Sequence, residues 1–170
     1  MREQIPDATF TPWSRIAIAL RGARSVQPKD PVVPRSTSGY SGKPLPQKLG
    51  VKPGTRLTLL GAPKDFATTL GTLPEDVVVT TRATALAETI VLFAKERAAL
   101  EKKLPAALRS LADKGALWAA WPKKASGVAT DLVEDVIREV AFAHGLVDVK
   151  VCAVDATWSS LCLRRRVSVR

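Results

Sequence analysis

Histidine, cysteine and long hydrophobic runs are all scarce in this chain of 170 residues. The single histidine, His144, argues against a metal site built from histidines and against a serine-type triad. Two cysteines are too few for a disulfide scaffold, so they favour a reduced, cytoplasmic protein. No apolar run approaches the length that crosses a bilayer, and the first 25 residues lack a secretory pattern. We therefore expect no membrane partner.

Positive charge is abundant instead, with a formal net charge of +10. Residues 1–38 carry six Lys and Arg against three Asp and Glu, and residues 39–170 carry twenty against thirteen. The excess therefore belongs to the globular part as well. It favours anionic partners, namely a phosphate-bearing small molecule or nucleic acid. A basic surface that is simply solvated is the competing interpretation.

Proline divides the chain, because eight of the twelve prolines come before Thr55. Residues 1–38 combine proline with polar and basic residues, a composition that cannot bury enough surface to offset chain entropy. We predict a disordered, basic, proline-rich tail over residues 1–38, or a start codon placed too far upstream. Residues 39–170, with an ordinary share of apolar residues, are predicted to form one α/β domain.

Short apolar runs separated by turn signals predict the elements of this domain. Strands are expected over residues 56–60, 77–80, 90–94 and 116–121, followed by a hairpin of residues 147–154 and 158–165. Helices are expected over residues 44–49, 65–70 and 96–112, the last kinked or split at Pro105. A fourth helix is expected from Thr130 as its N-cap to Gly145, with Leu132, Val133, Val136, Ile137 and Val140 on its buried face. This order predicts a three-layer, Rossmann-like α/β fold with a mainly parallel sheet and a C-terminal antiparallel hairpin.

A parallel sheet closed by an antiparallel last strand resembles the class I methyltransferase fold, here in shortened form. Residues 111–118 also resemble the segment that those enzymes place before their fifth strand. The wider pattern is similar to a chiefly actinobacterial domain-of-unknown-function family. That similarity rests on residues 39–42, 45–54, 121–127, 130–132 and 146–158. The resemblance implies the fold and a bacterial, cytoplasmic home, and it implies no known activity.

Three segments depart from what S-adenosylmethionine needs in that fold. The turn after the first strand has one glycine and a proline, the second strand ends without an acid, and the third lacks a polar motif after it. These segments are Gly61-Ala62-Pro63, Thr80-Thr81-Arg82 and Ala94-Lys95-Glu96. The sequence therefore predicts at most millimolar affinity for S-adenosylmethionine, about 4 kcal/mol, and leaves the cofactor unknown. Asp65, near the first turn, could still reach a ligand, and we interpret it in preference as a helix-start residue.

A loop elsewhere has stronger signs of ligand binding. Residues 121–127 follow a central strand and lead into a helix, a place where open α/β sheets bind ligands and where helix dipoles favour anions. Topology should bring the hairpin turn at Asp155 to the same edge, with Trp158 as a flat face for a base. The predicted ligand-binding residues are Lys123, Lys124, Ser126, Gly127, Thr130, Asp155 and Trp158. In the competing interpretation the lysines are solvated and Trp158 packs on the hairpin.

Other candidates have simpler explanations. His144 is expected to bond the last carbonyls of its helix, and Trp118 and Trp121 to pack in or beside the core. Cys152 and Cys162 are interpreted as buried small hydrophobes, with a redox pair as the alternative. The basic stretch 164–166 with Arg170 is expected to be solvated rather than a nucleic-acid site.

The sequence predicts as its main function a non-catalytic domain that binds an anion, a nucleotide or a partner. The first alternative is a divergent S-adenosylmethionine-dependent methyltransferase. The second is a basic accessory protein that binds nucleic acid. Catalysis is left open, because no residue pattern assigns a catalytic group.

Overall fold

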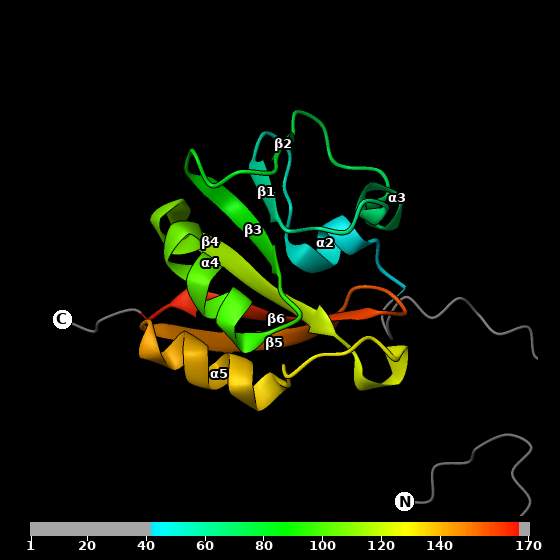
Figure 1. Ribbon diagram of the computed structural model, residues 1–170. Helices are drawn as coiled ribbons and strands as arrows, with labels where there is room; N and C mark the ends of the chain where they lie inside the picture. Colours follow the sequence, from blue (N-terminus) through cyan, green and yellow to red (C-terminus); the bar gives the residue numbers. More distant parts are fainter. Residues whose placement is uncertain (1–41, 167–170) are drawn as a thin grey trace, which may run out of the picture. The chain divides into compact units, whose positions relative to one another are not determined.

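The computed structural model describes residues 42–166 (Figure 1), and these residues form one six-stranded sheet with helices on both faces. The strand order is β2-β1-β3-β4-β6-β5. The strands are β1 (Arg56–Leu60), β2 (Val78–Thr80), β3 (Ala87–Phe93), β4 (Leu111–Pro122), β5 (Leu146–Ala153) and β6 (Trp158–Arg165). Strands β1 to β4 pair in parallel, whereas β6 runs antiparallel to both β4 and β5. The predicted fold class is confirmed.

Two pairs of helices cover the two faces of the sheet. The short helices α2 (Leu45–Leu49) and α3 (Phe66–Leu70) pack on one face, and α4 (Arg97–Arg109) and α5 (Glu134–Ala143) pack on the other (Figure 1). A single turn of 3-10 helix, η2 (Lys124–Ser126), follows β4. The indole N–H of Trp118 donates to the carbonyl of Leu49 at 2.9 Å, which fastens α2 to the sheet.

Strand β3 shows why both faces are buried. Its residues alternate in direction, as a strand requires: Ile90 and Leu92 pack with α4 and α5, while Val91 and Phe93 pack with α2 and α3. All four side chains are at most 2% exposed. The continuous apolar run in the sequence is therefore a strand between two helical layers, as predicted.

Two predicted helix details are wrong. The hydroxyl of Thr130 donates to the carbonyl of Lys95 at 2.6 Å and accepts the N–H of Leu132 at 3.0 Å, so it ties the chain to another loop. Helix α5 therefore begins only at Glu134, and Val133, which was predicted to be buried, is 55% exposed. Helix α4 continues through Pro105, so the predicted alternative of two helices is wrong; buried Leu104 and Ala107 anchor the helix on both sides of the proline.

Two sequence predictions concern the amino-terminal residues and membranes. The predicted tail over residues 1–38 lies outside the described residues. Within residues 42–166, no helix combines the length and the apolar character needed to cross a membrane.

Candidate functional site

The loop that the sequence singled out folds back on itself. The side chain of Lys123 donates to the carbonyl of Asp155 at 2.5 Å, and its backbone N–H donates to the carbonyl of Thr157 at 2.7 Å. The hydroxyl of Ser126 donates to the carbonyl of Lys123 at 2.7 Å. The loop after β4 and the hairpin turn therefore meet at one edge of the sheet, as predicted, but these bonds hold the loops together.

The side chains of Asp155 and Thr130 are also hydrogen-bonded within the protein. One carboxylate oxygen of Asp155 accepts the backbone N–H groups of Thr157 and Trp158, both at 2.7 Å, which closes the hairpin turn. Thr130 joins the segment before α5 to Lys95, and Asp131 beside it accepts the N–H of Arg97 at 2.7 Å. Of the remaining predicted residues, Lys124 and Gly127 are exposed on the turn. The seven predicted residues thus form a scaffold along this edge more than a cavity.

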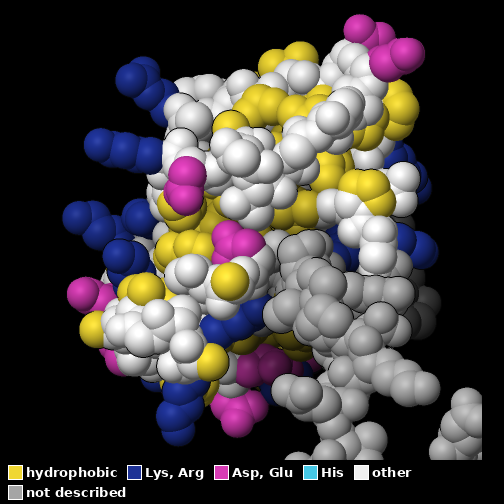
Figure 2. Space-filling view, turned by 90° about the vertical axis from the view of Figure 1, so that its right-hand side faces the viewer, with side chains coloured by type: hydrophobic (Ala, Val, Ile, Leu, Met, Phe, Trp, Pro, Cys, Tyr) yellow, Lys and Arg dark blue, Asp and Glu magenta, His cyan; other side chains and the backbone are white. Residues whose placement is uncertain are grey.

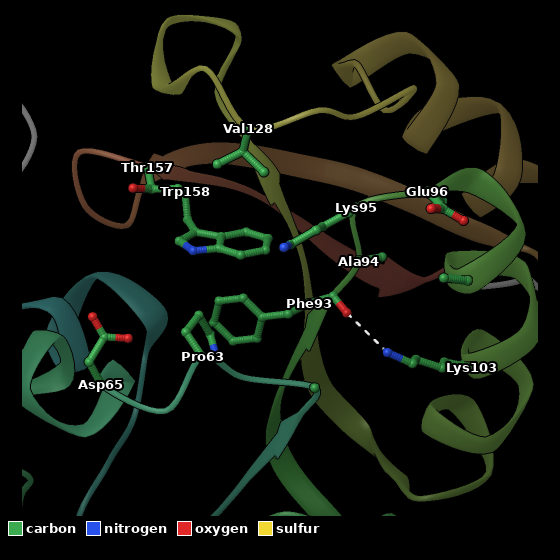
Figure 3. Close-up of a pocket in the computed structure, with 12 residues that line it drawn as sticks. Pro63, Asp65, Phe93, Ala94, Lys95, Glu96, Lys103, Val128, Thr157 and Trp158 are labelled. Atoms are coloured by element: carbon green, nitrogen blue, oxygen red, sulfur yellow. Dashed lines mark hydrogen bonds between the residues drawn. The ribbon is translucent and has the colours of Figure 1, made fainter.

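A cleft of about 640 Å³ lies beside that scaffold, at the carboxyl ends of β1 and β3 (Figure 3). Its wall is aromatic: the rings of Phe93 and Trp158 meet edge to face with centroids 5.1 Å apart. Phe66 packs on Phe93 in the same manner at 4.8 Å. Trp158 is only 7% exposed, so it packs mainly in the core and presents a small part of its ring to the cleft. It is the one predicted site residue that lines this cleft.

Gly61 follows β1 and lines the cleft. Its φ of +69° favours glycine, and a Cβ there would lie 2.9 Å from the Nζ of Lys103 and 3.1 Å from the carbonyl oxygen of Phe93. The ammonium of Lys103 hydrogen-bonds that same carbonyl at 3.4 Å. The absent side chain therefore makes room for a cation against the end of β3.

Two carboxylates line the cleft, and neither is among the predicted ligand-binding residues, although the sequence left open that Asp65 could reach a ligand. Asp65 precedes α3 and Glu96 precedes α4, yet neither side chain makes a capping hydrogen bond with its helix. Both are exposed and line the cleft, and Figure 3 shows them on opposite sides of it. Each follows the carboxyl end of a parallel strand, which is the one sequence signal that marks them. The helix-start interpretation of Asp65 is right about its position and incomplete about its carboxylate.

Lys95 adds a positive charge between these carboxylates. It is exposed, and in Figure 3 its ammonium extends toward the indole of Trp158. The cleft thus offers an apolar wall, two acceptors and two cations, Lys95 and Lys103. These are the groups that bind a zwitterionic ligand with a flat ring.

The secondary candidates lie where the sequence placed them. Cys152 and Cys162 are buried free thiols, and burial raises the pKa of each. His144 bonds the carbonyl of Val140 through Nδ1 at 2.9 Å. Arg165 donates to the carbonyl of Leu108 at 2.7 Å, so part of the basic stretch is structural. Within residues 42–166 no group of three or more His, Cys, Asp and Glu side chains is arranged to hold a metal ion.

Comparison with known proteins identifies the fold. No family model and no curated protein sequence matches the chain, so the resemblance to the actinobacterial family stays a prediction. Among solved structures, a putative type 11 methyltransferase from Sulfolobus solfataricus matches 74% of this chain and 92% of its own, with 11% identity and a TM-score of 0.51. The B. subtilis M1A22 tRNA methyltransferase TrmK matches 76% of this chain and 68% of its own, with 12% identity and a TM-score of 0.48.

The match to the putative type 11 methyltransferase corrects one sequence interpretation. It overturns the main expectation, a non-catalytic binding domain, in favour of the first alternative. At 11% identity the likeness shows the methyltransferase-like Rossmann fold and not an activity.

Proposed function

We propose that the protein is a divergent S-adenosylmethionine-dependent methyltransferase whose cofactor binds in the cleft at the ends of β1 and β3. The observation that carries this proposal is the position of the two cleft carboxylates. Asp65 and Glu96 follow parallel strands at the carboxyl edge, where open α/β sheets bind their ligands.

The groups in the cleft fit those of S-adenosylmethionine in kind. Its adenine ring needs an apolar surface, and the exposed edges of Phe93 and Trp158 supply part of one. The ribose hydroxyls and the ammonium of the cofactor donate hydrogen bonds that a carboxylate of the cleft can accept. The carboxylate of the cofactor needs a cation, such as Lys95. When bound, the cofactor supplies an electrophilic methyl group.

The expected acid at the end of β2 is replaced rather than lost. The hydroxyl of Thr80 is already bonded to that of Thr58 at 2.9 Å, and Arg82 beyond it is a cation. Asp65, on the loop between β1 and α3, is one of the two acids that line the cleft. We assign to it the role of accepting the ribose hydroxyls.

The remaining residues position and shield the site. The bond from Lys103 to the carbonyl of Phe93 holds a cation at the floor, where it attracts an anionic group of the ligand. Val128, from the segment that Thr130 bonds to Lys95, lies beside Trp158 in the cleft, where its apolar side chain would exclude water from a bound ligand. Fewer waters near the reacting groups strengthen each electrostatic contact.

Calorimetric titration with S-adenosylmethionine tests the proposal. We expect binding tighter than about 1 mM for the natural sequence and at least about tenfold weaker binding for Asp65→Asn, because a hydrogen bond to a charged group contributes about 1.5–3 kcal/mol. Asp113→Asn is the matched control, since Asp113 is also exposed but lies near the amino end of β4. Absence of binding, or equal affinity in both variants, would refute the assignment.

A closer relationship to the chiefly actinobacterial family, and a bacterial cytoplasmic location, also stay proposals. They are supported by the residue pattern of 121–127 and 146–158 and by the low cysteine count. Methyl transfer by a member of that family with acids at the positions of Asp65 and Glu96 would support the family relationship together with the activity.

A further inference from the structure

A second groove of about 680 Å³ adjoins the cleft. It lies between the end of β1, the segment after β2 and one side of α4. Its floor is made of small and apolar side chains, among them Leu60, Ala99 and Ala106. The rest of its lining includes three cations, Arg82, Lys102 and Lys103.

The helical part of this lining follows directly from the sequence. Ala99, Lys102, Lys103 and Ala106 are spaced by three and four residues, so they share one side of α4. Leu100, Leu104 and Ala107 form the neighbouring stripe, which is buried against the sheet. One side of helix α4 thus combines lysines with small alanine side chains, next to the apolar side that packs on the sheet.

The charge of the groove is not neutralised by the protein. None of the five ion pairs among residues 42–166 involves Arg82, Lys102 or Lys103, since those pairs use Arg97 and Arg138. No carboxylate lines the groove, in contrast to the cleft. Figure 2 shows lysine and arginine side chains gathered along one side of the molecule, beside a band of hydrophobic side chains. A groove with three cations and no carboxylate favours an anionic ligand.

The groove and the cleft share a border. Gly61, Ala99 and Lys103 line both cavities. A ligand in the groove therefore lies next to a ligand in the cleft, and the two can meet at this common border beside Lys103, which hydrogen-bonds the carbonyl of Phe93. This is the relation that an acceptor substrate needs to a methyl donor, because the two must meet within contact distance.

We infer that the groove holds the methyl acceptor and that this acceptor is a single-stranded nucleic acid. The inference rests on the proposed function for its catalytic part. Phosphates would pair with Arg82 and Lys102, and an unstacked base would lie on the floor of small side chains. The planar guanidinium of Arg82 can also stack on a base, which a lysine cannot do. The net charge of +10 adds long-range attraction for a polyanion.

The test uses the full-length protein and a short, fluorescein-labelled single-stranded RNA of mixed sequence, followed by fluorescence anisotropy. The test variant is Arg82→Ala with Lys102→Ala. The control is Lys52→Ala with Lys114→Ala, which removes the same charge from exposed positions that line neither cavity. Lys103 is left intact because its bond to Phe93 belongs to the cleft.

Loss of two phosphate contacts flattens the salt dependence of log K by about 1.4 and weakens binding about tenfold or more near 0.1 M salt. The control should weaken binding by about twofold or less, through long-range attraction alone. Equal losses in the two variants would overturn the inference, because they would show a response to net charge only. Displacement of the RNA by an equal charge concentration of polyglutamate would also overturn it, in favour of an acidic protein partner.

Titration with S-adenosylmethionine separates the two proposals. If the natural protein binds the cofactor while the groove and control variants bind RNA equally well, the acceptor assignment fails and the methyltransferase proposal stands. If only the groove variant loses RNA and the cofactor does not bind, the proposed function fails and the groove remains a nucleic-acid site.

Discussion

The loop over residues 123–127 and the cleft at the ends of β1 and β3 lie at the same edge of the sheet and use their polar groups in opposite ways. In the loop, the Lys123 side chain, the Ser126 hydroxyl and their carbonyl partners bond one another. In the cleft, Asp65 and Glu96 make no capping bond and line open space. Charge and glycine in a loop therefore indicate a turn as readily as a site. Side chains that line a cleft without hydrogen-bonding the protein's own backbone are the better sign of binding.

The largest expected effect is at Trp158, which belongs to both regions. Trp158→Ala removes a nearly buried ring from contact with Phe93, so we expect a loss of about 3–5 kcal/mol in the free energy of unfolding. Trp158→Phe keeps an aromatic ring and should lose distinctly less. Urea unfolding gives both values. Near-equal stability of Trp158→Ala and the natural protein would show that the ring serves ligands and not packing.

The next largest effect compares one glycine of the cleft with one glycine of the loop that has a similar backbone conformation. Gly61 and Gly127 have φ of +69° and +71°, but only Gly61 has neighbours within 4 Å of an added Cβ. Gly127→Ala should therefore cost about 1–2 kcal/mol from backbone strain alone. Gly61→Ala should cost about 1 kcal/mol more, because the carbonyl of Phe93 cannot move aside as a flexible side chain does. Thermal unfolding of the pair measures the difference, and a larger loss at Gly127 would contradict the crowding at β1.

The smallest effects distinguish the two lysines of the loop. Lys123→Ala breaks the bond to the carbonyl of Asp155, so we expect a loss of about 1 kcal/mol. Lys124 is exposed and makes no hydrogen bond among those found in the described residues, so Lys124→Ala should change stability by less than about 0.5 kcal/mol. Denaturant midpoints of the two variants decide this. Identical midpoints would mean that the tie to the hairpin turn contributes nothing.

The sequence was sufficient for the fold because the central strands contain compact apolar runs and the hairpin strands alternate around a short polar turn. Strand β1 over Arg56–Leu60 and the hairpin strands were predicted to within one residue. The start of β4 was missed because Asp113 and Lys114 are typical of a turn. In the structure, Leu111 before them pairs with Ala87 at the start of β3. A pairing partner from a distant segment cannot be read from local composition.

The site was less predictable for the same physical reason. The exposure of Asp65 and Glu96 to one cleft depends on where α3 and α4 begin relative to β1 and β3. The role of Thr130 depends on a carbonyl at Lys95, thirty-five residues earlier in the chain. The sequence pattern placed Trp158 at the edge of the sheet where the cleft lies, since topology alone brings the carboxyl ends of parallel strands together.

The central claim is that ligand binds in the cleft and not on the loop, and amide chemical-shift mapping during titration with S-adenosylmethionine tests it most directly. We predict saturable shifts at the backbone N–H groups of Gly61 and Lys95 and at the indole N–H of Trp158, with Lys124 and Gly127 nearly unchanged. Shifts confined to Lys124 and Gly127, or no shifts at millimolar cofactor, would contradict the account.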